Sequence, residues 1–323
     1  MKAIVHDVYG PPEVLRPAEI PQPVPGRGEV LVRVRAAGVD QGVWHLTAGR
    51  PYLIRAAGFG LRAPANRVRG IDVAGRVAAV GPDVTRLRAG DEVYGGCGGS
   101  FAEYACAKED QLAPKPRTLG FEEAAAVPVS ACTALKALRD VGRLTAGQHV
   151  LVLGASGGVG TFAVQLAKAL GARVTGVCSP GKADLVRSIG ADEVLDYTTQ
   201  DPTDGSVRYD LVLDIAGNRP LSRLRRALTA RGTLVIVGGE GGGSWIGGND
   251  RQLRALMLSP FTGQRLRPLA AGVRHEDLLA LTRFIEAGRV TPVVDRVHPL
   301  AEVPEAVRRL RAGEVRGKAV IAV

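Results

Sequence analysis

The stretch that decides the fold is Gln148–Gly171, QHVLVLGASGGVGTFAVQLAKALG. It begins with the apolar, valine-rich run Val150–Leu153, which is too short for a helix and therefore predicts a buried parallel strand. The glycine-rich segment Gly154–Gly160 follows and predicts a turn. From Phe162 onward apolar residues recur at helical spacing, and Gly171 is placed to end the helix.

A strand, a glycine-rich turn and a helix in this order are the context in which such a turn binds a dinucleotide. Small residues let the backbone turn sharply, let a pyrophosphate approach the main chain and let the helix pack on the strand. The N–H groups at the start of the helix then face an anion. The alternative is a glycine-rich turn without a ligand, and the flanking strand and helix favour the dinucleotide site.

The length and composition predict a globular protein of two domains or of one large domain. The chain has 323 residues, of which 46% are hydrophobic and 23% are charged. It has no apolar run long enough to span a membrane, and its first residues do not resemble a signal peptide. The four cysteines are scattered and form no CxxC pair, so we expect a reduced, cytoplasmic protein without structural zinc.

The formal net charge is +10 at pH 7. The excess of basic residues is spread along the chain and does not form a continuous run. This distribution favours a solvated basic surface over a dedicated nucleic-acid site.

Residues 1–118 are predicted to form a β-rich domain. Short β-type segments such as Ala3–Val5, Val30–Arg35 and Val73–Val80 alternate with Pro-Gly turns, which is typical of a small barrel or a partly open β-domain. Residues 40–66 are less regular and contain several aromatic side chains. This segment is either a substrate-facing region or a surface loop that packs its own aromatic residues.

Residues 119–288 are predicted to form an α/β domain with a doubly wound parallel sheet, because strand-type and helix-type segments alternate. The glycine-rich segment 238–248 is expected to be mobile. The remaining residues, 289–323, return to β-type segments around one helix and are expected to rejoin the N-terminal domain.

Several stretches together resemble the medium-chain dehydrogenase/reductase superfamily, and within it the zinc-free quinone oxidoreductase-like branch. They include MKAIVHDVYGPPEVL, GRGEVLVRV, RAGDEVYG, GGSFAEYA, AAAVPVSACTAL, GASGGVGTFAVQLAKALGA, SIGADEVLDY, HPLAEVPEAVRRL and GKAVIAV. The resemblance implies a GroES-like catalytic domain, formed by 1–118 and 289–323, around a Rossmann NADP-binding domain at 119–288. It also implies a homodimer that pairs through the edge of the Rossmann sheet.

The resemblance also bears on zinc, which related alcohol dehydrogenases bind through a cysteine, a Gly-His-Glu segment and a further ligand. Here Asp40 stands where that cysteine would be, and Ile71-Asp72 replaces His-Glu. Zinc prefers sulfur and nitrogen ligands in tetrahedral sets, which two isolated aspartates do not supply. We therefore expect no metal.

The cofactor is expected to be NADPH. NAD-selective folds carry an acid about 20 residues beyond the first glycine, where it binds the ribose 2′-OH. Between Gly154 and Lys182 this chain has no acid. Ser179 and Lys182 could instead bind a 2′-phosphate, and the resemblance adds Tyr197 to them. A solvated lysine at a helix start is the alternative for Lys182.

The resemblance extends the cofactor site beyond the glycine turn. It places Thr133 near the nicotinamide and Lys318 near the cofactor phosphates. The full set of expected cofactor-binding residues is Thr133, Ala155, Ser156, Gly157, Gly158, Val159, Ser179, Lys182, Tyr197, Gly217, Asn218, Gly238, Gly239 and Lys318.

Without a metal to polarise a carbonyl, a quinone or an α,β-unsaturated carbonyl is the easier hydride acceptor, because the product anion is delocalised. Tyr52, His45 and Tyr94 are the polar aromatic candidates for a proton or hydrogen-bond donor, and we select Tyr52. Two alternatives remain open. One is a trans-acting enoyl reductase for carrier-bound thioesters, and the other is a nucleotide-binding protein with an RNA-binding role.

Overall fold

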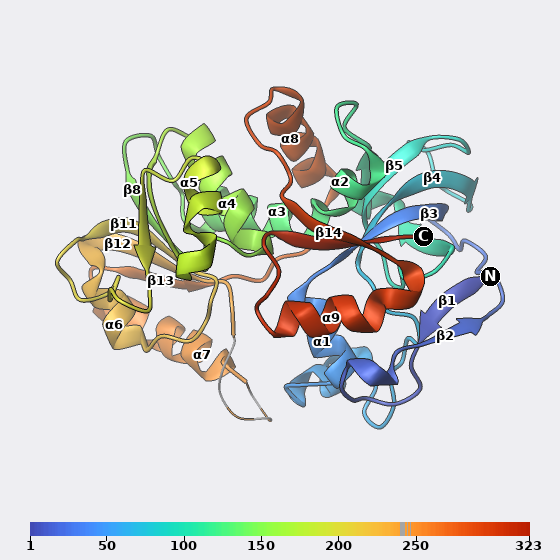
Figure 1. Cartoon of the computed structure of the whole chain (residues 1–323), viewed down its shortest axis with the longest axis horizontal. Coiled ribbons are helices and arrows are strands. Elements are labelled where there is room, and N and C mark those ends of the chain that lie inside the picture. Colours follow the sequence, from blue (N-terminus) through green and yellow to red (C-terminus); the bar gives the residue numbers. More distant parts are fainter. Residues whose placement is uncertain (240–242, 244, 246) are drawn as a thin grey trace. The chain divides into compact units, whose positions relative to one another are not determined.

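The chain divides into two units. The β-rich unit comprises Met1–Cys132, Gly272–Gly288 and Pro292–Val323, and the α/β unit comprises Thr133–Ala271 and Arg289–Thr291. A computed structural model describes residues 1–239, 243, 245 and 247–323 (Figure 1). Part of the glycine-rich segment 238–248, which we expect to be mobile, lies outside the described residues.

The β-rich unit is organised around one antiparallel sheet with a parallel strand at its edge. The order of its strands is β14-β15-β3-β4-β5-β7, and β6 also pairs with β3; β1 and β2 form a separate antiparallel pair. The strands of the unit are β1 (Lys2–Val5), β2 (Arg16–Glu19), β3 (Glu29–Val39), β4 (Asp72–Val80), β5 (Glu92–Gly96), β6 (Tyr104–Lys108), β7 (Leu112–Pro114), β14 (Val294–Pro299) and β15 (Lys318–Ala322).

The middle of β3 shows the alternation of a strand with one buried and one exposed face, whereas its end is buried throughout. In β3, Val30, Val32 and Val34 belong to one buried cluster, whereas Arg33 between them is exposed. The helices of this unit are α1 (Gln41–Ala48), α2 (Phe121–Ala125), α8 (His275–Glu286) and α9 (Val303–Arg311), and α3 (Pro128–Lys136) begins in it. The last strand, β15, pairs antiparallel with β3, with Ala319 opposite Val39, so the C-terminal tail joins the N-terminal sheet as predicted.

The α/β unit contains a six-stranded, fully parallel sheet in the order β10-β9-β8-β11-β12-β13, which is a doubly wound arrangement. Helices cover both faces of this sheet, with α4 and α5 on one and α6 and α7 on the other (Figure 1). The elements are β8 (His149–Leu153), α4 (Gly158–Ala169), β9 (Arg173–Cys178), α5 (Ala183–Ser188), β10 (Glu193–Asp196), β11 (Tyr209–Asp214), α6 (Leu221–Arg226), β12 (Leu228–Ile236), α7 (Asn249–Leu258) and β13 (Arg265–Pro268).

The apolar run that we interpret as a buried parallel strand is the centre of this sheet. Leu151 lies opposite Val212 of β11 on one side and Thr175 of β9 on the other. All three side chains are buried, as a strand covered by helices on both faces requires. The prediction of a buried parallel strand is therefore confirmed, and the structure adds its central place in the sheet.

The structure corrects the predicted domain boundary. We assigned 119–288 to the Rossmann domain, but Gly272–Gly288, which carries α8, belongs to the β-rich unit, and the α/β unit begins at Thr133. The reason is a set of hydrogen bonds within the β-rich unit. The Tyr94 hydroxyl donates to the Leu278 carbonyl at 2.7 Å, and His275 Nδ1 lies 2.7 Å from the Leu112 carbonyl.

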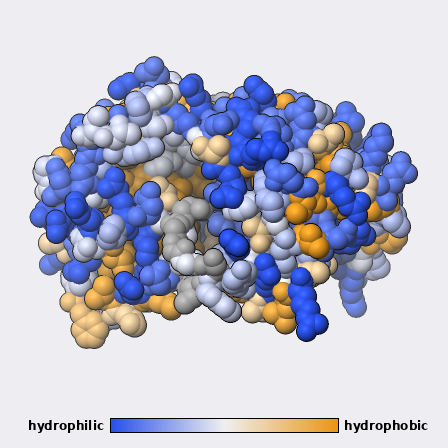
Figure 2. Space-filling model, turned by 60° about the horizontal axis from the view of Figure 1, so that its bottom comes forward, coloured by the Kyte–Doolittle hydropathy of each residue, from blue (hydrophilic) through white to orange (hydrophobic). Residues whose placement is uncertain are grey.

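No helix among the described residues is long and apolar enough to cross a membrane. On the face seen in Figure 2, polar and charged side chains cover most of the surface, and apolar side chains form separate patches between them. This distribution agrees with the moderate hydrophobic content of the chain.

Candidate active site

The glycine turn between β8 and α4 has the geometry of a pyrophosphate site. Gly154 has a φ of +89°, and its N–H and that of Ala155 both donate to the Val177 carbonyl, at 3.1 and 2.9 Å. The N-cap of α4 is Gly157, which offers no side-chain cap. The first N–H groups of the helix are therefore not used by the helix itself and can bind an anion.

Close packing explains the last glycine of this turn. A Cβ atom at Gly160 would lie 2.1 Å from the carbonyl oxygen of Gly154, so no larger residue fits there. The expected contacts Ala155, Ser156, Gly157, Gly158 and Val159 all lie in the turn or the first turn of α4. The residues present fit a bound pyrophosphate.

The structure brings Ser179, Lys182 and Tyr197 to one edge of the sheet. Cys178, the last residue of β9, lies opposite Asp196 of β10, so Ser179 and Tyr197 follow directly after two paired strands. The N–H of Tyr197 donates to the Cys178 carbonyl at 3.4 Å, and the N–H of Lys182 donates to the Ser179 carbonyl at 3.0 Å. These three residues therefore form a group at the end of β9, where a ribose is bound in doubly wound folds.

One acid, Asp196, lies near this group, but its carboxylate already accepts hydrogen bonds from Thr198. Oδ1 of Asp196 accepts hydrogen bonds from the N–H and the hydroxyl of Thr198, at 2.9 and 2.8 Å. β9 itself ends without an acid. The position that would bind a ribose 2′-OH in an NAD-selective fold therefore remains without a carboxylate.

The turns after β11 and β12 are held by Asp214, which sequence reasoning did not single out. Its carbonyl accepts from Gly238 N–H at 3.0 Å, and its Oδ1 accepts from Gly217 N–H at 3.1 Å. Its Oδ2 accepts from the guanidinium of Arg251 in α7. Burial raises the pKa of Asp214, and Arg251 opposes that shift. Asp214 thus joins the two segments that carry Asn218 and Gly239, the first through its carboxylate and the second through its backbone carbonyl.

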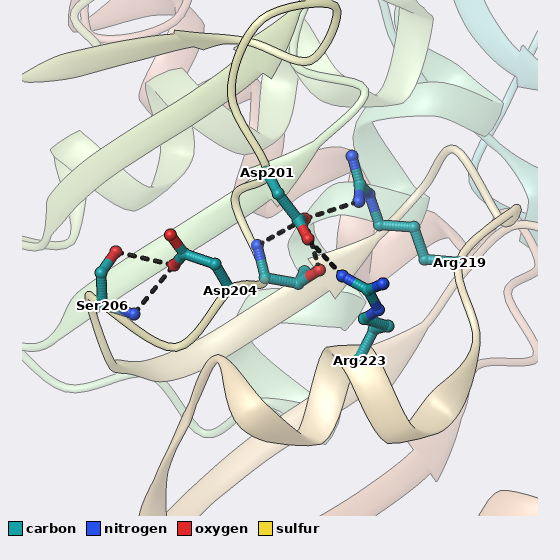
Figure 3. A network of polar contacts seen from close by, with 6 residues as sticks. Asp201, Asp204, Ser206, Arg219 and Arg223 are labelled. Carbon is teal, nitrogen blue, oxygen red and sulfur yellow. Dashed lines mark hydrogen bonds and ion pairs between the residues drawn. The ribbon is translucent and has the colours of Figure 1, made fainter.

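A second polar network stabilises the turn that follows β11. Asp201 accepts from Arg219 at 2.9 Å and from Arg223 at 2.7 Å, and it also binds the N–H and hydroxyl of Thr203 (Figure 3). Arg219 directly follows Asn218, so the network fixes the end of that turn. Its signal in the sequence is weak, because Asp201 lies in an irregular segment.

Thr133 and Lys318, two of the expected cofactor contacts, belong to different units of the chain. Thr133 lies within α3, is 9% exposed and is the first residue of the α/β unit. Lys318 is 1% exposed in the β-rich unit, and its Nζ donates to Asp72 Oδ2 at 2.8 Å. The amine of Lys318 is thus engaged in a buried ion pair, and its role near the cofactor phosphates stays a prediction.

The ion pair lies over Gly38 in β3, between the strands that carry the two partners. A Cβ atom at Gly38 would lie 2.6 Å from Asp72 Oδ2, which explains the glycine. The other carboxylate oxygen of Asp72 accepts from Val129 N–H at 2.7 Å, at the start of α3. Burial raises the pKa of Asp72 to about 6; Lys318 opposes this shift and Asp40 adds to it.

The residues at the zinc-ligand positions of the resemblance do not fit zinc. Both oxygens of Asp72 are engaged, and Ile71 has no donor atom. Asp40 caps α1 through Oδ1, which accepts from Val43 N–H at 3.2 Å. No group of three or more His, Cys, Asp or Glu residues among those described could hold a metal ion. A single aspartate oxygen does not make a zinc site.

The three polar aromatic candidates lie in different surroundings. Tyr94 is buried, and burial raises its pKa. Its hydroxyl donates to the Leu278 carbonyl, so it is not available to donate to a hydride acceptor. His45 Nδ1 donates to the Arg50 carbonyl at 3.0 Å. Tyr52 is half-buried, and the guanidinium of Arg55 lies 4.8 Å from the centre of its ring.

Comparison with known proteins finds family matches in two parts of the chain. Residues 26–117 match the family described as "Alcohol dehydrogenase GroES-like domain", and residues 189–321 match the family described as "Zinc-binding dehydrogenase". The chloroplast envelope quinone oxidoreductase homolog of Arabidopsis thaliana is 32% identical, over 99% of this chain and 98% of that protein. The 2-methylene-furan-3-one reductase of Solanum lycopersicum is 32% identical, over 99% of this chain and 79% of that protein.

Solved structures give the same result. The quinone oxidoreductase from Coxiella burnetii has a TM-score of 0.88 and 28% identity, covering 100% of this chain and 99% of that one. Mycobacterial Rv1454c, solved in complex with NADPH, has a TM-score of 0.83 and 28% identity, covering 100% of each chain. The chain is therefore an oxidoreductase enzyme that belongs to the medium-chain dehydrogenase/reductase superfamily, in its quinone oxidoreductase-like branch.

Proposed function

We propose that this protein is an NADPH-dependent oxidoreductase that transfers a hydride, without a metal, to a quinone or an α,β-unsaturated carbonyl. The observation that carries this proposal is the state of Asp72. At a position where related enzymes hold zinc, its two oxygens are bound to Lys318 and to Val129 N–H. Among the described residues this position therefore offers no ligand set for a Lewis acid, which supports an acceptor that itself stabilises the product anion.

The proposed cofactor contacts lie within the α/β unit. The free N–H groups at the start of α4 would bind the pyrophosphate, and the turns that end in Asn218 and Gly239 would border the cofactor. Ser179, Lys182 and Tyr197 would bind the 2′-phosphate. The NADPH complex of mycobacterial Rv1454c supports this choice of cofactor.

In the proposed reaction the cofactor and the protein have separate roles. When bound, NADPH supplies the hydride, and the chain orients it and limits access of water. A conjugated acceptor needs in addition only a hydrogen-bond donor or proton source. We propose Tyr52 for that role. The Arg50 and Arg55 guanidiniums lie 5.9 and 4.8 Å from its ring centre, and their positive charge would favour a developing anion nearby.

Isotopic labelling tests this proposal most directly. NADPH deuterated at C4 of the nicotinamide is incubated with the enzyme and a small enone, and the product is analysed by mass spectrometry and NMR. We expect one deuterium at the β-carbon of the product. Labelled product only from an enoyl thioester on a carrier would instead favour the trans-acting enoyl reductase. No label in any conjugated acceptor, including a quinone, would contradict the proposal.

We also propose that the protein acts in the cytoplasm as a reduced protein. All four cysteines are thiols that form no disulfide, and three of them, Cys97, Cys132 and Cys178, are buried. Burial raises the pKa of the Cys97 thiol to about 12, which keeps it unreactive. Thiol counts before and after reduction, which we expect to be equal, test the redox part of this proposal.

A further inference from the structure

A pocket rich in arginine lies in the α/β unit, away from the glycine turn. Its volume is about 480 Å³, within the range of small-molecule sites. Its lining includes Arg208, which directly precedes β11, and Arg226, which directly precedes the loop into β12. Because all the strands are parallel, this is the amino-terminal edge of the sheet, whereas Gly154 follows the carboxyl end of β8.

Three guanidiniums line this pocket, and its lining contains no acid among the residues that the structure describes. The guanidiniums belong to Arg208, Arg225 and Arg226. Within the part of the chain that the structure describes, none of the three has an ion pair with a carboxylate. Basic residues at the end of α6 also favour its dipole, but that effect does not require a concave site.

Two of the arginines are held in place by uncharged partners. Nη1 of Arg208 donates to the carbonyls of Arg226 and Leu228, at 2.9 and 3.1 Å. Nε of Arg225 donates to Oε1 of Gln264 at 3.1 Å, while the amide of Gln264 donates back to the Arg225 carbonyl at 3.0 Å. These bonds orient the side chains without neutralising them.

The acids of the neighbouring loop are committed elsewhere. Asp201 is bound by Arg219 and Arg223, and Asp204 accepts from the N–H and hydroxyl of Ser206 (Figure 3). The fold thus separates two groups of arginines. One group is neutralised by Asp201, and the other lines the pocket with its charge intact.

An aromatic ring completes the site. Phe261 is 85% exposed and belongs to the pocket lining, together with the hydroxyl-bearing residues Ser222 and Thr262. Guanidinium groups bind phosphate oxygens in a bidentate manner, and an exposed ring offers a surface on which a nucleobase can stack.

We propose that this pocket binds a nucleoside polyphosphate at a site separate from the cofactor turn. Its phosphates contact the guanidiniums of Arg208, Arg225 and Arg226, and its base stacks on Phe261. The site does not depend on the identity of the hydride acceptor.

Calorimetric titration of the NADPH-saturated protein tests the proposal, because saturation prevents the probe from entering the cofactor site. The probes are ATP and inorganic triphosphate, each titrated up to about 1 mM, a concentration that detects even weak sites. We expect both to bind with one-to-one stoichiometry. Arg226→Met should raise both dissociation constants about tenfold, since the side chain of Arg226 is exposed and its loss leaves the fold intact.

Two further variants make the test specific. Phe261→Leu should weaken ATP binding severalfold and leave triphosphate binding unchanged, because only the base contacts the ring. Arg254→Met removes one exposed arginine of α7 outside the pocket and should change neither constant. Equal losses in Arg226→Met and Arg254→Met would overturn the proposal. So would no binding of either probe, or binding of a single-stranded RNA oligonucleotide without binding of ATP.

Discussion

Lys182 is the single residue on which the proposed choice of cofactor depends most. It lies at the start of α5, close to Ser179 in the chain. The preceding strand, β9, ends without an acid that could bind the ribose 2′-OH. We expect Lys182→Ala to raise the dissociation constant of NADPH about 10- to 100-fold, equivalent to roughly 1.5–3 kcal/mol for a charge-assisted contact, and to leave that of NADH unchanged. Fluorescence titration with both cofactors measures the two constants.

The matched control for this test is Lys168→Ala. Lys168 lies in α4 of the same unit and pairs with Asp192 at 2.8 Å on the surface, so its loss should alter neither constant. Equal affinities of the unaltered protein for NADPH and NADH, insensitive to Lys182→Ala, would contradict the proposed specificity.

The buried pair of Asp72 and Lys318 predicts a pH dependence of stability. The raised pKa of Asp72, about 6, means that the folded state binds this proton more tightly than the unfolded state does. The contribution of this carboxyl to stability is therefore complete below about pH 4 and is lost as the pH rises to 6.

Urea unfolding at several pH values measures this contribution by comparison with the uncharged double variant Asp72→Asn/Lys318→Met. The difference in free energy of unfolding, original protein minus variant, should fall by about 1–3 kcal/mol between pH 4 and 6 and then level off. A difference that rises over this interval would show that Lys318 outweighs burial.

At the residue scale the sequence predicts contacts that are local in the chain. The glycine turn lies between β8 and α4, and the Ser179–Lys182 segment lies between β9 and α5, as the order of strand and helix patterns predicts. The ion pair of Lys318 with Asp72 is not local, because the two residues are 246 positions apart and only the pairing of β15 with β3 and of β3 with β4 brings them together. No spacing rule could indicate that ion pair.

The element that carries the cofactor turn predicts a contrast between two of its glycines. A Cβ at Gly160 would lie 2.1 Å from the Gly154 carbonyl oxygen, whereas one at Gly157 would have only an ordinary contact of 3.6 Å. Gly160→Ala should therefore destabilise the protein by about 2 kcal/mol or more, and Gly157→Ala by well under 1 kcal/mol. Chemical denaturation compares the two variants.

Gly157→Ala should nevertheless weaken NADPH binding, because its methyl group occupies the approach to the pyrophosphate. It thus separates folding from binding within one turn. Unchanged NADPH affinity in Gly157→Ala would mean that the pyrophosphate does not lie at this turn.

Among the elements, strands and helices with a regular apolar pattern could be predicted, and two helices could not. The segment that holds α1 has a glycine at its second position, and packing stabilises it, with Val43 in the core and Arg311 3.8 Å from the centre of the Trp44 ring. In α7, Leu253, Leu256 and Met257 are exposed, so the apolar residues do not mark a buried face.

At the scale of the whole molecule we propose a homodimer, which the family resemblance implies. β13 is an edge strand of the six-stranded sheet, and the exposed side chains of Leu256 and Met257 come shortly before it in the chain. An unpaired edge next to apolar side chains favours association with a second copy. Light scattering should give twice the mass of one chain at micromolar concentration, and a monomer at all concentrations would contradict the proposal.

The division into two units could be predicted in outline from the change between β-type and alternating segments. The place of α8 could not, because its apolar residues indicate a helix without indicating which sheet it joins. That choice depends on hydrogen bonds from Tyr94 and His275, which are distant in sequence from their partners. Helix periodicity predicts burial, whereas long-range polar contacts select the partner.

The most direct test of the central claim, metal-free hydride transfer to a conjugated acceptor, is a comparison of steady-state rates before and after chelation. Zinc is measured by elemental analysis, and the rates are those of enone or quinone reduction with NADPH and of secondary-alcohol oxidation with NADP⁺. We predict less than stoichiometric zinc, reduction rates that chelation leaves unchanged, and little alcohol oxidation. Stoichiometric zinc whose removal abolishes turnover, or alcohol oxidation faster than reduction of either acceptor, would contradict the account.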